Sequence, residues 1–439
     1  MTANEFILLF SAIPIGLVSG LIFGMPPSLV ILLALPLLWS IDPNFILAFY
    51  VIIMITSQYT NSVMAIYTGI PGDITAIPIV KERKSLFQNF SIRENLQRTA
   101  VASTIGVIFG WTFLLLFFEI ISQYSNNLMR STIILAVLVS ILLISIFWKG
   151  NHKLINFFLV IVGSVTGMVG YHYIINLNVL TFNNLSLVGG LPLIAGFSGL
   201  YAIPNILHLT KFYKDSKINE NFNEDSKQKP FSFVDFRTGL DSLWGSFIGI
   251  MGLIPLIGCT MSSNLSYAVS KKITPISLRR AVFSESANSS AFVIVMAPLL
   301  FFGVAIIPSE FILLETLRGS GWRADNVNRE TFFILLFVSL LTVVISYYFS
   351  TRIAQYTVIF LIKYIKYISI FLLFAISSNV YFIGGLTNEY GLYMTTFAFS
   401  SMAGIILNKL KIDTLPLIFS WAIAEMLINT SITVISLYS

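Results

Sequence analysis

Long apolar runs that carry almost no charge are the feature that most restricts how this chain can fold. Hydrophobic residues make up 56% of the 439 residues and charged residues only 10%, whereas soluble globular proteins carry about 25% charged residues. The runs are continuous and lack the alternation of apolar and polar residues that a membrane β-barrel requires. The sequence therefore predicts an all-α polytopic membrane protein.

About ten of these runs are predicted to cross the membrane completely. They lie near residues 44–68, 100–122, 131–148, 154–176, 185–208, 281–303, 331–350, 368–384, 391–408 and 414–435. Basic connections between them fall on one face, which marks that face as cytoplasmic. Nearly neutral loops, among them 177–184 and 310–330, fall on the other face with both termini. The net charge of +6 is explained by these basic loops rather than by nucleic acid, and we expect a multi-pass protein of the bacterial inner membrane.

Two further apolar segments, 5–40 and 240–270, are interrupted in the middle. In the second, apolar arms flank residues 255–260, and neither arm has the roughly 20 residues that a full span needs. Pro255 cannot donate a backbone hydrogen bond, and Gly258 adopts backbone conformations that other residues avoid. Such a break is tolerated at membrane depth only inside protein or beside water. We therefore predict two re-entrant helical hairpins, although two short spans in place of each hairpin would leave every loop on the same side.

The two interrupted segments also belong to a longer repeated pattern. Gly16, Gly20 and Pro26 recur 229 positions later as Gly245, Gly249 and Pro255, and Asn61-Ser62 recurs 227 positions later as Asn288-Ser289. Because the two hairpins enter from opposite faces, the pattern predicts an inverted repeat, which is typical of secondary transporters. The predicted halves are residues 1–208 and 239–439, joined by a cytoplasmic linker at 209–238.

Helices that begin after the two breaks offer unpaired N–H groups and a partial positive charge, which suits an anion. Polar side chains nearby add hydroxyl and amide groups. The predicted substrate-binding residues are Gly24, Pro26, Pro27, Ser28, Asn61, Ser62, Gly258, Cys259, Thr260, Asn288 and Ser289. The alternative for the Asn and Ser residues is that they only bond neighbouring helices.

Coupling to an ion gradient has its own candidates: Asn61, Asn288, Glu285 and Glu425. Carboxyl groups inside spans are costly and are therefore functional candidates. The alternative for Glu425 is a protonated or snorkelling structural residue, and for Glu285 a charge at the start of a helix.

An enzyme would need paired acids, clustered metal ligands or a nucleophile beside a base. The three histidines, His152, His172 and His208, are scattered without metal-ligand spacing. We expect neither catalysis nor a cofactor, apart from Na⁺ or H⁺ as the coupling ion.

Ordered motifs along the chain carry a resemblance to a known family. They are Gly20, Gly24 and Pro27; Ile70-Pro71-Gly72; Pro255, Gly258 and Thr260; Ser266-Tyr267-Ala268; Glu285, Ala287 and Asn288; and Pro298 with Gly303. In this order they resemble the TctA family, the large membrane (permease) subunit of tripartite tricarboxylate transporters. Phe23 and Leu256 stand where the family has proline and glycine, which marks a divergent member.

The resemblance implies a secondary active transporter subunit that imports a small organic carboxylate by alternating access. It also implies a small four-helix membrane subunit and a periplasmic solute-binding protein as partners. Because no Arg or Lys lies in the middle of a span, a small monovalent substrate fits better than citrate. The alternative is an uncoupled or non-transporting membrane scaffold derived from such a permease, which the departures at Phe23 and Leu256 keep open.

Overall fold

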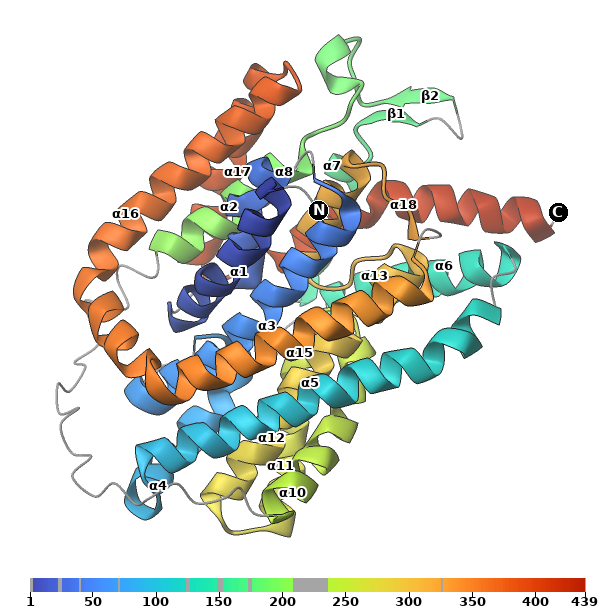
Figure 1. Cartoon of the computed structure of the whole chain (residues 1–439). Coiled ribbons are helices and arrows are strands. Elements are labelled where there is room, and N and C mark those ends of the chain that lie inside the picture. Colours follow the sequence, from blue (N-terminus) through green and yellow to red (C-terminus); the bar gives the residue numbers. More distant parts are fainter. Residues whose placement is uncertain are drawn as a thin grey trace.

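The protein is described by a computed structural model over residues 3–22, 26–38, 41–69, 72–123, 127–147, 153–172, 176–207, 236–324 and 327–438. These residues are mainly helical (Figure 1). The first part contains α1 (Ala3–Leu21), α2 (Pro27–Leu38), α3 (Pro43–Thr68), η1 (Ile74–Ala76), α4 (Ile77–Asn89), α5 (Ile92–Gln123), α6 (Asn127–Ile146), α7 (Lys153–Gly167), β1 (Gly170–His172), β2 (Leu177–Val179), η2 (Leu185–Leu187), α8 (Leu193–Phe197) and the π-helical η3 (Ser198–Ala202). The second contains α10 (Phe236–Ile248), η4 (Gly249–Leu253), α11 (Gly258–Ile273), α12 (Ser277–Ile294), α13 (Met296–Phe302), α14 (Pro308–Gly319), α15 (Arg329–Arg352), α16 (Ala354–Leu386), α17 (Tyr390–Lys409) and α18 (Leu415–Tyr438).

Helix α3 lies at the centre of the molecule and is surrounded by other helices. It packs against α1, α5 and α15, while α5 packs in turn against α12. Figure 1 shows α5 and α15 side by side, with α4, α10 and α11 at one end of the molecule and the two strands at the other. All of α3 from Ile46 to Tyr67 is buried, so its polar residues must find partners inside the protein.

Seven helices of the described residues are long and apolar enough to cross a bilayer. They cover Pro43–Thr68, Ile92–Phe118, Ser277–Phe302, Arg329–Arg352, Lys363–Leu386, Tyr390–Lys409 and Leu415–Ser436. Seven of the predicted spans are therefore confirmed as helices of spanning length.

The three other predicted spans are not among these seven helices, and those predicted at 154–176 and 185–208 are shorter than expected. The helices there cover Arg130–Ile146, Lys153–Gly167 and Leu193–Leu207. The second ends early because the chain turns into an antiparallel strand pair, in which Gly170 faces Val179 and His172 faces Leu177. The fold is thus helical as predicted, with one small strand pair that apolar periodicity did not reveal.

Residues 310–330, expected to form a polar loop, instead begin inside a buried helix. Pro308 lies in the first turn of α14, a position that does not require a backbone N–H. Phe311, Ile312, Leu313 and Leu314 are all buried. This apolar run is too short to be recognised as a span, and the surrounding helices α2 and α3 supply the core that buries it.

The backbone break predicted at the second tip is present. Helical turns stop at Leu253, and α11 begins at Gly258. Between them Leu256 has a positive φ of 69°, which is strained for a leucine. Its N–H donates to the carbonyl of Ile306 at 3.0 Å.

The other predicted boundaries are met in part. The first break lies between Leu21 and Pro27, and Gly24 falls outside the described residues. Most of the predicted linker, residues 209–235, also lies outside the described residues. The description resumes with α10 at Phe236. The hairpin and inverted-repeat topologies remain predictions.

Candidate functional site

Polar side chains from α3, α5 and α12 meet inside the protein. We call this group the polar seam and define it as Gln58, Ser62, Ser103, Glu285, Asn288 and Ser289, all buried. Threonines on α3 do not join it, because Thr56 and Thr60 donate to carbonyls of their own helix.

A carboxyl group lies at one end of the polar seam. Glu285 is only 2% exposed. Its Oε2 accepts a hydrogen bond from the Ser62 hydroxyl at 2.5 Å, and its Oε1 accepts one from the Ser103 hydroxyl at 2.6 Å. In the part of the chain that the structure describes, no basic side chain pairs with Glu285. Two serine hydroxyls on two other helices are therefore its polar partners.

An amide pair lies at the other end of the polar seam. The Asn288 Nδ2 donates to Gln58 Oε1 at 2.6 Å and so joins α12 to α3. The Asn288 Oδ1 and the Ser289 hydroxyl are both buried and have no hydrogen-bond partner among the described residues. Unsatisfied buried polar atoms are rare in native proteins, so these two atoms are available to a ligand.

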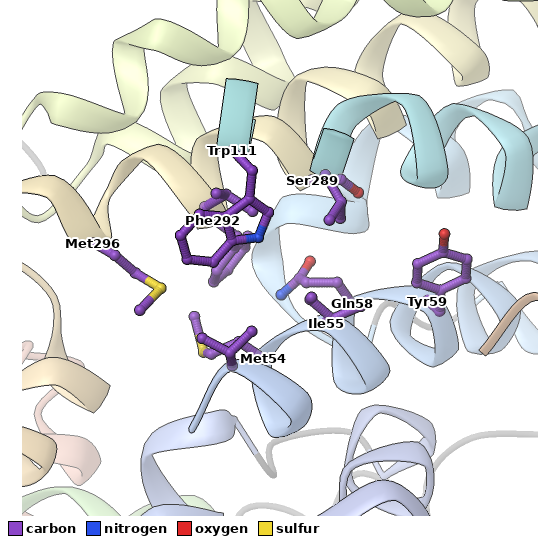
Figure 2. Close-up of a pocket in the computed structure, with 11 residues that line it drawn as sticks. Met54, Ile55, Gln58, Tyr59, Trp111, Ser289, Phe292 and Met296 are labelled. Atoms are coloured by element: carbon purple, nitrogen blue, oxygen red, sulfur yellow. The ribbon is translucent and has the colours of Figure 1, made fainter. Parts of the chain in front are cut away.

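A small cavity lies beside this amide pair (Figure 2). Its volume is about 10 Å³, which is room for about one water molecule. Gln58 of α3 and Ser289 of α12 line the cavity, and Figure 2 shows their side chains with those of Trp111 and Phe292. The rest of the lining is mainly apolar, and the polar atoms of Tyr59 and Trp111 bond Thr104 and Ser339. A carboxylate does not fit in this conformation because the cavity is too small.

Polar and titratable side chains also lie near the starts of α11 and α2, the helices that follow the two breaks. Cys259 is buried near the start of α11, and both Glu310 and Asp73 act on it electrostatically. Ser28, near the start of α2, is buried and interacts with the hydroxyl of Tyr201 in η3. A polar side chain of another segment therefore lies at the start of α2, and substrate binding by Ser28 and Cys259 remains a prediction.

The remaining tip residues are neighbours of Ser28 and Cys259 in the sequence. Pro27 and Gly258 are buried, while Pro26 and Thr260 are partly exposed. Their contact with a substrate remains a prediction.

Asn61 belongs to a different group from Asn288. Its Oδ1 accepts the Asp73 N–H at 2.6 Å, and its Nδ2 donates to the Thr75 hydroxyl at 3.2 Å. Both polar ends of the amide therefore connect α3 to the turn that follows it. These bonds favour the alternative role for Asn61, that of bonding neighbouring segments.

Glu425 does not lie in the polar seam either. Its side chain is exposed in a hollow of about 830 Å³, which Glu315, Arg318 and His172 also line. This hollow lies beside β1 and α14. The structure therefore separates Glu425 from Glu285, although both were expected to serve ion coupling.

Three buried residues were missed by the sequence analysis: Gln58, Ser103 and Glu310. Gln58 lies within the polar stretch of α3, and that stretch was a usable signal. Ser103 has no distinguishing local pattern, because only the packing of α5 on α12 brings it to Glu285. Glu310 was overlooked because its segment was predicted to be a loop.

Helices of spanning length around a buried polar seam define a polytopic membrane protein of the permease class. The chain belongs to the tripartite tricarboxylate transporter TctA family, whose family model matches residues 6–419. It is therefore a membrane subunit of such a transporter and not an enzyme. No curated protein and no solved structure matches the chain.

Proposed function

We propose that this subunit imports a small organic carboxylate across the bacterial inner membrane by alternating access, driven by Na⁺ or H⁺. Membership of the TctA family supports the transport role. A periplasmic solute-binding protein supplies the substrate, and a small four-helix membrane subunit completes the assembly.

The observation that carries the proposal is the carboxyl of Glu285. It is buried between three helices with Ser62 and Ser103 as its hydrogen-bond donors. Ionisable groups inside a membrane protein are costly and commonly belong to ion or substrate pathways. Because no basic side chain balances the charge of Glu285 within the described residues, a coupling cation is the natural partner of this carboxyl.

Binding of the substrate is assigned to the neighbouring amide and hydroxyl groups. The hydroxyl of Ser289 can donate to a carboxylate, and the Asn288 amide lies next to it in the sequence. The adjoining cavity of about 10 Å³ is too small for any carboxylate. Binding therefore requires another conformation, as alternating access does.

Contacts of the glycines support a repeat of the same helix packing in the two halves. A Cβ on Gly20 would meet Ser57 and Thr60 of α3, and a Cβ on Gly249 would meet Ala287 and Ser290 of α12. The two halves thus use the same kind of close helix contact, with small residues at the interface.

These contacts also refine how the repeats align. They match Ser57 to Ala287 and Thr60 to Ser290, so Gln58, rather than Asn61, corresponds to Asn288. The hydrogen bond from Asn288 to Gln58 then joins equivalent positions of the two halves. A bond of this kind lies on or near the pseudo-two-fold axis.

The test is uptake by cells that express the whole tripartite system, with mono-, di- and tricarboxylates, at varied pH and Na⁺. We expect a small monocarboxylate to be preferred and Glu285→Gln to remove the dependence on the cation gradient. The control is Glu425→Gln, the same change in the exposed hollow, which should leave that dependence intact. If no carboxylate is taken up by the wild-type system, the proposal fails in favour of a non-transporting scaffold.

A further inference from the structure

A second buried carboxyl, Glu310, lies outside the polar seam and has an unusual set of partners. It is 0% exposed. Its Oε2 accepts the N–H of Ile306 at 2.9 Å, and the N–H of Ile307 also interacts with this carboxyl, whereas the Oε1 has no geometrically formed hydrogen bond among the described residues. One oxygen of a fully buried acid is therefore unsatisfied.

Capping of a helix explains only half of this arrangement. Glu310 lies in the first turn of α14, where an acidic side chain commonly reaches back to a free N–H. The Oε2 does this. Nothing in a helix cap requires the Oε1 to be buried without a partner, which costs free energy.

The surroundings of Glu310 supply no positive charge. The titratable side chains that interact electrostatically with Glu310 are Tyr50 of α3 and Cys259 of α11. A phenol and a thiol are neutral when protonated, so neither can carry a positive charge. Helices α2 and α13, which pack nearby, contain no titratable residue. On α14 itself Glu315 pairs with Arg318 near the other end of the helix.

A buried carboxylate without a counter-charge is normally neutralised by a proton. A proton also needs no cavity, and none of the described cavities includes Glu310.

The peptide group of Ile306 connects this carboxyl to the broken helix. Its N–H bonds Glu310, and its carbonyl accepts the N–H of Leu256 at 3.0 Å. Leu256 is the residue with the strained positive φ in the break. Two hydrogen bonds in series therefore join the Glu310 carboxyl to the backbone of the predicted hairpin tip.

We propose that Glu310 is a proton-binding site that controls the conformation of the break at residues 254–257. A proton binds to Oε1 and makes the side chain a neutral acid. Its loss to water leaves a buried charge that pulls more strongly on the Ile306 N–H and favours water entry beside Leu256. The link between this proton and substrate movement rests on the proposed transport function, but the proton site itself does not.

The first experiment measures protonation directly, by infrared difference spectroscopy of the full chain in lipid during a pH titration. We expect a protonated-carboxyl band that is present in the wild type and lost in Glu310→Gln, because glutamine has no carboxyl group. The variant should keep its structure, because the Gln oxygen still accepts the Ile306 N–H. Glu315→Gln is the matched control from the same helix and should retain the band. An unchanged spectrum in Glu310→Gln would overturn the proposal.

The second experiment follows the conformation of the break through Cys259, the single cysteine of the chain. We expect the rate at which the wild type reacts with a maleimide to rise several-fold beyond the intrinsic effect of pH on a thiol as Glu310 loses its proton. Glu310→Gln should abolish this excess, and Glu315→Gln should keep it. A wild-type rate that follows the intrinsic thiol alone would overturn the proposal even if no variant folds. Neither measurement depends on uptake, so a failure of the transport proposal would be recognised separately.

Discussion

Serine hydroxyls, rather than basic side chains, hold the central acid of this protein. Each oxygen of Glu285 accepts one short hydroxyl bond, from Ser62 or Ser103. Hydrogen bonds to a charged group contribute about 1.5–3 kcal/mol each. A buried salt bridge would instead have to offset the larger cost of desolvating two ions. Such an arrangement can release or exchange a cation, because no permanent counter-charge competes for the carboxylate.

We expect Ser62→Ala and Ser103→Ala each to weaken the binding of the coupling cation. Each removes one donor that orients the carboxyl of Glu285. The cation concentration for half-maximal uptake should rise by about tenfold, which corresponds to about 1.4 kcal/mol. Thr56→Ala is a suitable control, since its hydroxyl bonds only its own helix. An unchanged cation requirement in both serine variants would exclude a role for these hydroxyls.

Asn61 and Asn288 should respond differently to substitution by alanine. Asn61→Ala loses bonds to Asp73 and Thr75, so we expect a lower melting temperature, from a loss of about 1–3 kcal/mol, with an unchanged KM. Asn288→Ala should raise KM for the carboxylate. Melting curves and uptake kinetics on both variants check this, and a raised KM in Asn61→Ala would make that residue a ligand after all.

At the scale of the elements, close helix pairs depend on particular glycines. Gly245 of α10 lies against Phe283 and Ser286 of α12, where a Cβ would collide with backbone and hydroxyl oxygens. Backbone atoms cannot move aside as a flexible side chain can. Gly239, on the same helix, has nothing within 4 Å of an added Cβ.

Gly245→Ala should therefore destabilise the protein, and Gly239→Ala should not. Overpacking typically costs about 1–3 kcal/mol, whereas replacing a helical glycine by alanine where the Cβ meets nothing stabilises a helix by up to about 1 kcal/mol. Thermal unfolding in detergent measures both. If the two variants had equal melting temperatures, the close packing of α10 on α12 would be refuted.

At the scale of the whole molecule, one ion pair and one hydrogen bond on the buried carboxyl of Glu82 join the two predicted halves. The carboxyl of Glu82 in α4 pairs with Arg280 of α12 at 3.1 Å and accepts the Tyr267 hydroxyl of α11 at 2.6 Å. These contacts lie at the end of the molecule that carries α4, α10 and α11 (Figure 1). This end is the one that the basic loops assign to the cytoplasm.

Cysteine accessibility can test that assignment. In a Cys259→Ala background, Lys84→Cys and Ser186→Cys place a thiol at exposed positions in α4 and η2. We expect a membrane-impermeant maleimide to label Ser186→Cys, but not Lys84→Cys, in intact spheroplasts. Labelling of both after permeabilisation is the control, and the reverse pattern would invert the proposed orientation.

Much of the architecture was predictable because it depends on local chemistry. A run of apolar residues near α3 must be buried in lipid or protein wherever it lies, and Pro255 interrupts a helix in any environment. The buried helix α14 was not predictable in this way, since its apolar run is short and only its neighbours bury it. The same reason explains why Glu310 escaped notice.

The sequence alone therefore determined the membrane class, the helices of spanning length, the break before Gly258 and the family. These properties follow from solvent preference and backbone chemistry within a few residues. Only the tertiary structure decided which polar groups meet. Glu285 bonds serines that are 223 and 182 positions away, and Glu425 lies apart from it in an exposed hollow. Contacts over such separations depend on how complete helices pack, and no local pattern in the chain records that packing.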